Sequence, residues 1–287
     1  MSYLNIYTEN VSNLDCAILT PSMGPVGQSW LVSLKVTGSV QKSGFICDFQ
    51  DVKTIVHDII SSLDHTLFII KDPGIFLEDD PNLNTVSVSL DPSVYPWSYS
   101  CPKDAVFCDT TGLLSFKDNL SFTELITKYL NHKLSKTNFP SNVVEASFSL
   151  SSEQDPSCFC YTHALSNYEG LCQRPYHGHR SKLNVLKDGT RLYDIESKLV
   201  KKYNNIHMST SSQIKSIDSD YITLDFDGTR GKYITTLPTD RVLILDESPT
   251  LEHFVTHIAS DIKESYGISG FNLVISEGIG KGVTYND

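Results

Sequence analysis

The feature that most constrains the fold of this chain is an internal repeat. Residues 7–13 (YTENVSN) read against residues 161–167 (YTHALSN), and the Ser-Glu pair at 152–153 precedes a tyrosine by the same spacing as the Ser-Glu pair at 276–277. A chain of 287 residues is long enough for two domains, and self-similarity of this kind indicates two copies of one structural unit. We therefore expect one unit over residues 1–161 and a second over residues 162–287, with little linker between them.

Each expected unit combines strands with two helices. In the first copy, residues 30–38 alternate as a half-buried strand does, and residues 52–63 place apolar side chains on one helical face. A second helix begins at Ser121, which forms a capping box with Glu124, and two closing strands follow at 143–151 and 157–161. The second copy repeats the plan with a strand at 182–186, a helical stripe over 192–206, a hairpin at 221–235, a helix after Pro249 and a strand at 271–277. This order predicts an α+β fold with antiparallel sheets and helices packed on one face of each sheet.

Two histidines in the second copy, His177 and His179, are separated by a single glycine. In an extended strand their side chains point to the same face, because side chains alternate with period two, so both can bind one metal ion. A catalytic zinc ion uses three protein ligands and one open position, and His163 is the candidate third ligand. Cys172 could act as a nucleophile or base beside the metal, where positive charge favours a thiolate. The alternative interpretation of the histidine pair is the polar end of a strand.

Composition excludes several classes of protein. A formal net charge of −11 argues against a nucleic-acid backbone as partner. The chain has no run of 18 apolar residues, which would predict a membrane span, and its N-terminus lacks the pattern of a signal peptide. We therefore expect a cytoplasmic location. The seven cysteines are odd in number and irregularly spaced, unlike a disulfide framework. An anionic substrate would need a local basic cluster, for which Arg174, Arg180, Lys182 and Lys281 are available.

These motifs together resemble the 6-pyruvoyl-tetrahydropterin synthases and the related 6-carboxytetrahydropterin synthases. The second copy is similar to them through residues 159–163, through Cys172 followed by the sequence HGH at 177–179, and through the Ser-Glu pair at 276–277. The first copy is similar through residues 44–49 and the sequence LDH at 63–65. The resemblance implies the tunnelling fold (T-fold), in which small α+β units assemble into a barrel. The chain departs from the family after His179, where it has Arg180 in place of the usual asparagine or serine.

The resemblance also implies roles for particular residues. The ligands of a Zn²⁺ ion would be His163, His177 and His179, and Glu277 would anchor a pterin ring through its amino and ring N–H groups. Zinc polarises substrate oxygens and makes neighbouring C–H protons acidic, so a thiolate with a nearby imidazole can move them. The catalytic residues implied for that proton transfer are Cys172, Asp64 and His65, the last two acting as a dyad that activates the cysteine.

The two copies complement each other. In the first copy the repeat places Glu9, Val26 and Gln28 at the metal-ligand positions, so we expect no metal there. In the second copy Asn204-Asn205 follows the helix that should end in Leu-Asp-His, so we expect that copy to lack the dyad. Because family sites lie between neighbouring units, one complete site could combine the second copy's metal ligands with the first copy's dyad. Glu153 matches Glu277 and could anchor a second pterin, although a structural role is favoured.

The sequence therefore predicts a zinc-dependent lyase that converts a dihydroneopterin triphosphate-type substrate to a 6-pyruvoyl- or 6-carboxy-tetrahydropterin. The alternative is a catalytically inactive pterin- or purine-binding protein of the same fold, produced by loss of function after duplication. Urate oxidase also has two such units, but it uses no metal and would leave the three histidines unexplained. The expected partners are a small-molecule pterin and further copies of the chain, as a trimer of fused pairs or a larger homo-oligomer, with no nucleic acid and no membrane.

Overall fold

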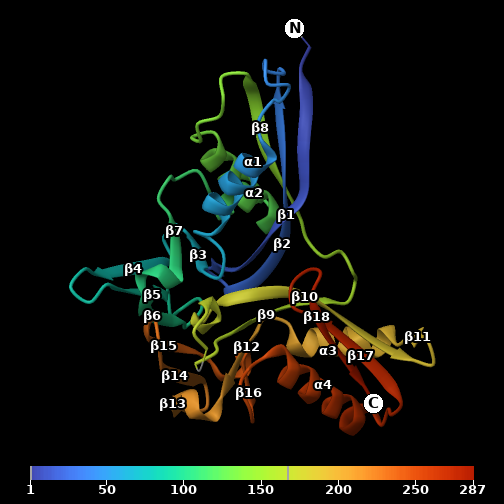
Figure 1. The fold of residues 1–287 in the computed structure, drawn as a ribbon. Helices are drawn as coiled ribbons and strands as arrows, with labels where there is room; N and C mark the ends of the chain where they lie inside the picture. Colours follow the sequence, from blue (N-terminus) through green and yellow to red (C-terminus); the bar gives the residue numbers. More distant parts are fainter. Residues whose placement is uncertain (1, 167) are drawn as a thin grey trace.

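The computed structural model describes residues 2–166 and 168–287 (Figure 1). Its first sheet has the strand order β7-β3-β1-β2-β8. The strands are β1 (Leu4–Thr20), β2 (Gly24–Gly38), β3 (Leu67–Ile70), β7 (Val106–Asp109) and β8 (Val143–Ser151). Helices α1 (Phe49–Ile60) and α2 (Phe122–Leu134) cover one face, where Trp30, Phe68 and Tyr129 belong to a shared apolar core. The expected capping box of Ser121 and Glu124 opens α2.

The second sheet repeats this arrangement, with the order β16-β12-β9-β10-β17-β18 and the short β11 beside β10. The strands are β9 (Cys158–His163), β10 (His177–Lys187), β11 (Thr190–Arg191), β12 (Ile206–Thr210), β16 (Val242–Leu245), β17 (Phe271–Ser276) and β18 (Gly282–Asn286). Helices α3 (Tyr193–Tyr203) and α4 (Leu251–Tyr266) pack on it around Phe159 and Phe254. In both sheets the long central strands are antiparallel, whereas the two strands at one end of the sheet, β3 and β7 in the first and β12 and β16 in the second, run parallel to their neighbours.

A third sheet joins the two units. Three of its strands come from the first unit, β4 (Ile75–Asp80), β5 (Thr85–Leu90) and β6 (Ser98–Pro102), and three from the second, β13 (Ile214–Ile217), β14 (Tyr221–Gly228) and β15 (Gly231–Pro238). Strands β6 and β15 pair antiparallel across the units, with Tyr99 opposite Thr235. The sequence predicted the hairpin of the second unit at 221–235 but not this pairing, which removes one exposed sheet edge from each unit.

Several expected boundaries need correction. Helix α1 ends at Ile60 and not at Leu63, and Ile206 is the first residue of β12 and not part of the preceding helix. Short 3₁₀ helices connect other elements: η1 (Lys103–Ala105), η2 (Phe116–Asp118), η3 (Leu171–Gln173), η4 (Ser211–Gln213) and η5 (Thr239–Arg241). The expected unit boundary at Tyr161 falls inside β9, which pairs with β10 along its whole length. We propose that the boundary lies in the segment between β8 and β9.

The strand register also revises the alignment of the repeat. His163 lies opposite His177 in the second unit, and Ile18 lies opposite Val26 in the first. The first-unit counterpart of His163 is therefore Ile18, a buried apolar residue, and not the exposed Glu9. The sequence repeat misplaced this position because it aligned residues 7–13 with residues 161–167, whereas the strand register makes residues 13–18 of β1 the counterpart of β9.

The two units meet where their central hairpins pack together (Figure 1). Gly27 of β2 and Gly178 of β10 are counterparts in the repeat, and a Cβ atom added to Gly178 would lie 2.6 Å from the Cα atom of Gly27. Both glycines are required by this close approach of backbones. The contact places each hairpin of one unit beside the dyad position of the other. No helix in the described part of the chain is both long and apolar enough to cross a membrane.

Candidate metal centre and active site

The three predicted metal ligands come together at the start of the β9–β10 pair. His163 and His177 face each other across the two strands, and His179 follows two residues later on the same face. One ring nitrogen from each lies within 4.8 Å of the others. All three side chains are buried.

The backbone fixes which ring nitrogens face inward. His163 donates from Nδ1 to the carbonyl of Pro249 (2.8 Å), and His177 donates from Nδ1 to the carbonyl of Arg174 (2.9 Å). The Nε2 atoms of both are buried without a partner among the described residues. Burial, together with the neighbouring histidines, holds the pKa of His163 and His177 well below the ordinary value. The rings are therefore neutral at pH 7, and neutral imidazole nitrogens oriented in this way are suited to binding a divalent metal ion.

The residue before the histidine pair, Tyr176, adopts a left-handed backbone conformation with φ of 67°. Such a conformation is unfavourable for a bulky residue and persists where packing enforces it. The Tyr176 ring packs against Trp97 and Tyr99 of the first unit, at 5.3 Å and 5.0 Å between ring centroids, and its hydroxyl bonds to that of Thr235. Through these contacts with Tyr176, Trp97 and Tyr99 help to position His177.

The predicted dyad of the first unit reaches the same place. His65 Nδ1 lies 2.7 Å from Asp64 Oδ2, and the other oxygen of Asp64 accepts from the backbone N–H of Asp15 (2.9 Å). The His65 ring stacks on that of His177. Burial lowers the pKa of His65, but the hydrogen bond to Asp64 and the contact with Cys172 outweigh it and raise the pKa to about 10. His65 is therefore an imidazolium at pH 7.

Cys172 and Glu277 complete the predicted set. The Cys172 sulfur lies within 4.8 Å of ring nitrogens of His65 and His177, so it faces both the dyad and the metal ligands. Glu277 follows β17 and places one carboxylate oxygen 3.9 Å from His179 Nε2 and the other 3.4 Å from Lys281. All seven predicted site residues thus lie in one cluster, which is built from both units.

Asp15 belongs to this cluster and was not predicted. Its carboxylate lies 3.4 Å from His179 Nδ1, accepts from the hydroxyl of Ser29 (2.5 Å) and is 3.6 Å from Lys281. Burial alone would raise the pKa of Asp15, but His179, Ser29 and Lys281 lower it to about 2. The available signal was an aspartate inside the otherwise apolar run of residues 14–19, because a buried carboxylate needs a partner.

The equivalent dyad position in the second unit is occupied by Asn204 and Asn205. Asn204 Oδ1 accepts from the backbone N–H of Cys160 (2.9 Å), as Asp64 does from Asp15, and Asn205 has a left-handed φ of 61°, as His65 has at 56°. This position therefore carries two amide side chains where the first unit has a carboxylate and an imidazole. His207, two residues on, is a buried strand residue that bonds to Thr162.

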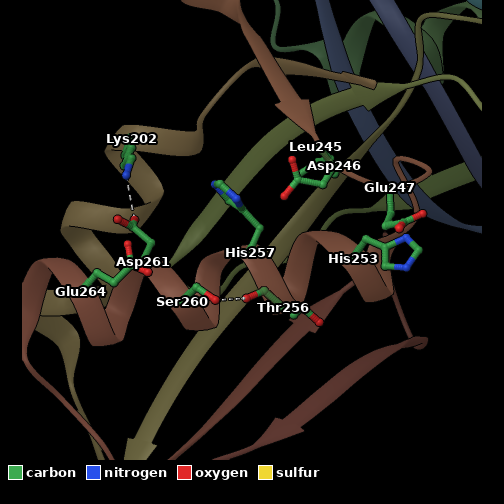
Figure 2. A pocket seen from close by; sticks show the side chains of 10 residues that line it. All are labelled: Lys202, Leu245, Asp246, Glu247, His253, Thr256, His257, Ser260, Asp261 and Glu264. Atoms are coloured by element: carbon green, nitrogen blue, oxygen red, sulfur yellow. Dashed lines mark hydrogen bonds and ion pairs between the residues drawn. The ribbon is translucent and has the colours of Figure 1, made fainter. Parts of the chain in front are cut away.

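A surface hollow of about 450 Å³ lies elsewhere, between α3 and α4 (Figure 2). His253 and His257 line it, as do several acidic residues, but Asp261 is already paired with Lys202 (2.8 Å). Its other carboxylates, Asp246, Glu247 and Glu264, are exposed to solvent. The hollow contains neither Cys172 nor the buried histidines, and so it is separate from the candidate metal centre.

The fold and the site define a protein of two fused α+β units with a candidate metal centre at their junction. The sequence model of the family described as 6-pyruvoyl tetrahydropterin synthase matches residues 25–138 and 154–287, which is most of the chain and corresponds to one copy in each unit. The chain therefore belongs to this family, in two copies, and each unit is a T-fold.

Individual relatives cover smaller parts of the chain. A putative 6-carboxy-5,6,7,8-tetrahydropterin synthase of Archaeoglobus fulgidus is 37% identical over 41 residues, which is 14% of this chain and 36% of that protein. The chain thus spans about a third of the length of this curated relative. Among solved structures, 6-pyruvoyl tetrahydropterin synthase of Plasmodium falciparum is 22% identical with a TM-score of 0.41, over 53% of this chain and 92% of that one. The Plasmodium vivax enzyme is similar at 16% identity and a TM-score of 0.38, with the same coverage.

Proposed function

We propose that the chain is a zinc-dependent lyase of the tetrahydropterin synthase type, with one active site built from both units. Its substrate would be a dihydroneopterin triphosphate-type molecule and its product a 6-pyruvoyl- or 6-carboxy-tetrahydropterin. The proposal rests on the position of Cys172, whose sulfur lies within 4.8 Å of ring nitrogens of His65 in the first unit and His177 in the second. A protein that only bound a ligand would have no need of a thiol between an imidazolium and three metal ligands.

The residues present fit a zinc ion. His163, His177 and His179 would hold it, since their inward nitrogens are buried and unpartnered among the described residues, and three protein ligands leave the open position of a catalytic site. Zinc would polarise a substrate oxygen and make the adjacent C–H bond more acidic. Asp15 would orient His179 from the side opposite the metal, as carboxylates commonly do for histidine ligands.

Proton transfer would be carried out by Cys172 together with the dyad of Asp64 and His65. Cys172 would pass its thiol proton to the dyad and then remove the proton from the activated substrate carbon. His65 would hold a proton close to the Cys172 sulfur. Asp64 would keep the imidazole protonated and in place, since Asp64 Oδ2 lies 2.7 Å from His65 Nδ1. Glu277 would accept hydrogen bonds from the pterin amino and ring N–H groups, with Lys281 Nζ 3.4 Å from one of its oxygens.

We also propose that fused pairs assemble further, as a trimer or a larger homo-oligomer. Strand β18 is the outer strand of the second sheet, and β8 is that of the first. Their free edges could pair with other copies and close a barrel.

The test is the activity of the Cys172→Ala variant. Zinc-loaded protein would be incubated with dihydroneopterin triphosphate and the products separated by chromatography and weighed by mass spectrometry, which also distinguishes pyruvoyl from carboxy products. We expect the wild type to form product, and Cys172→Ala to retain zinc but lose turnover by about 10²-fold or more, the usual contribution of a general base. The matched control is Cys47→Ala, which removes a half-buried thiol outside the site and should leave the rate unchanged.

Metal content is measured in the same preparations. We expect about one zinc per chain, because the first unit has Ile18, Val26 and Gln28 at the ligand positions, and we expect it to be lost in His177→Ala. The exposed His57 provides the control variant His57→Ala. Zinc without any product would favour the inactive pterin- or purine-binding protein. No zinc even after reconstitution would refute the proposed lyase.

A further inference from the structure

A second cavity lies at the other junction between the units, with a volume of about 510 Å³. Residues from both units line it: Val26 and Gln28 of β2, the first turn of α2 with Ser121 to Thr123, Cys160 of β9, Arg180 of β10, and Asn204-Asn205 after α3. This volume is typical of a small-molecule site.

The cavity is the internal counterpart of the metal centre. The repeat relates Gln28 to His179 and Val26 to His177, and the backbone geometry relates Asn204-Asn205 to Asp64-His65. Each junction therefore combines a hairpin of one unit with the dyad position of the other. At this second junction the metal ligands and the acid–base pair are absent, yet the cavity remains open, whereas an unused interface could pack closed.

The cavity differs in charge from the metal centre at three equivalent positions. Cys160 pairs with Arg180 across the strands at the positions where the first unit has Asp15 and Ser29. A buried carboxylate is thus replaced by a thiol, and a hydroxyl by a guanidinium. Asn204 likewise replaces the carboxylate of Asp64 with a neutral amide.

The carboxylates near Arg180 are already paired with other cations. Glu153 lies 3.4 Å from Lys182, and Asp155 makes two hydrogen bonds with Arg191, of 2.9 Å and 3.0 Å. Arg180 donates from Nε to the backbone carbonyl of Glu153 (3.3 Å), and no carboxylate among the described residues forms an ion pair with it.

Two amide side chains at the cavity each have one group without a partner among the described residues, a donor on Asn204 and an acceptor on Gln28. Gln28 is more than nine-tenths buried and donates weakly to the Cys160 sulfur (3.6 Å), while its carbonyl oxygen has no partner among the described residues. The Asn204 carbonyl oxygen is occupied by the backbone N–H of Cys160, which leaves its NH₂ group as a donor. A guanidinium and an amide donor at one cavity favour an oxyanion.

We propose that this cavity binds a small oxyanion, phosphate- or carboxylate-bearing, independently of the metal centre. A second pterin anchored by Glu153 does not fit, because one Glu153 oxygen accepts from the backbone N–H groups of Gln154 and Asp155 and the other faces Lys182. The proposal holds whether or not the metal centre is catalytic.

The test is isothermal titration calorimetry of the full chain with inorganic triphosphate and, separately, with citrate. These two probes distinguish a phosphate from a carboxylate ligand. We expect one of them to bind with a stoichiometry of one per chain. Arg180→Gln should weaken that binding at least tenfold, whereas Lys35→Gln, which removes an exposed cation from the same strand as Gln28, should change it less than twofold.

A second variant, Asn204→Asp, tests the proposal independently in case Arg180→Gln does not fold. Asn204→Asp places in the cavity the residue that the chain itself has at position 64, where a carboxylate oxygen already accepts the equivalent backbone hydrogen bond. We expect this variant to fold, by circular dichroism, and to weaken anion binding at least tenfold by repulsion. His177→Ala, which tests binding at the metal centre, should leave the affinity unchanged. Failure of both anions to bind the wild type, equal affinity in Arg180→Gln and the wild type, or loss of binding in His177→Ala would each overturn the proposal.

Discussion

The imidazole of His65 stacks on that of His177, with ring centroids 5.1 Å apart and planes inclined by 22°. These residues are more than a hundred positions apart and belong to different units. Their contact brings the predicted dyad of one unit to the predicted metal ligands of the other. All seven predicted site residues are therefore supplied by a single chain, and neither unit alone contains the whole set.

Replacing His65 by asparagine tests the dyad without disturbing the backbone. The chain already has asparagine at the equivalent position 205, in the same left-handed conformation. We expect His65→Asn to fold and bind zinc normally but to lose turnover by about 10²- to 10⁴-fold, the range for a group that moves protons. Steady-state kinetics and zinc content measured on one preparation would check this. Unchanged turnover would remove His65 from the mechanism.

Asp15→Asn tests how His179 is held. The carboxylate lies 3.4 Å from His179 Nδ1, and its charge favours the tautomer that leaves Nε2 for the metal. We expect zinc affinity to fall about 10- to 100-fold, as for other losses of a carboxylate behind a histidine ligand, measured by competition with a chelator. The control is Asp58→Asn, an exposed carboxylate on α1. Equal zinc affinity in Asp15→Asn and the wild type would mean that His179 is held by strand geometry alone.

Gly178→Ala tests the contact between the hairpins. The added methyl group would lie 2.6 Å from the Cα atom of Gly27 and 2.6 Å from the carbonyl oxygen of Tyr161, so backbone would have to move. We expect a loss of about 1–3 kcal/mol in the free energy of unfolding, as for other overpacked interiors, together with weaker zinc binding. Gly74→Ala is the control, because its nearest atom would be at 3.5 Å. Urea denaturation checks both, and similar stability of the two variants would contradict the close contact.

Asp155→Asn should change the dependence of stability on pH. Its hydrogen bonds to Arg191, with a smaller one from the backbone of Ser157, hold the pKa of Asp155 below the ordinary value. A lowered carboxyl pKa stabilises the folded chain above the unfolded pKa, near 3.8, and that stability is lost as pH falls through the folded pKa. At pH 7 we expect the wild type to be more stable by about 1–3 kcal/mol, with the difference shrinking below about pH 4.

Urea denaturation at pH 7 and pH 3 would measure this difference. Asp58→Asn should show no difference from the wild type at either pH, since its carboxylate is exposed. A gap for Asp155→Asn that stays constant between the two pH values would show that the loss arises from packing and not from the charge of the pair.

Much of the site was readable from the sequence because its motifs are local. The spacing of His177 and His179 in a strand places both on one face whatever the rest of the chain does. The pair at Asp64-His65 was identified from the family resemblance. The repeat itself predicted two units, but its alignment at Glu9 failed, because residues 7–13 lie nearer the start of the long strand β1, whereas residues 13–18 are the structural counterpart of β9.

Amino-acid sequence by itself determined the α+β units, the three histidines, the cysteine and the asparagines at the second dyad position, because each depends on side-chain type and short-range periodicity. Only the tertiary structure decided that β6 pairs with β15, that Asp15 lies behind His179, and that Cys160 and Arg180 occupy at one junction the positions that Asp15 and Ser29 have at the other. These relationships join residues far apart in the chain. They depend on how closely two backbones can approach at Gly27 and Gly178, and no local pattern specifies that distance.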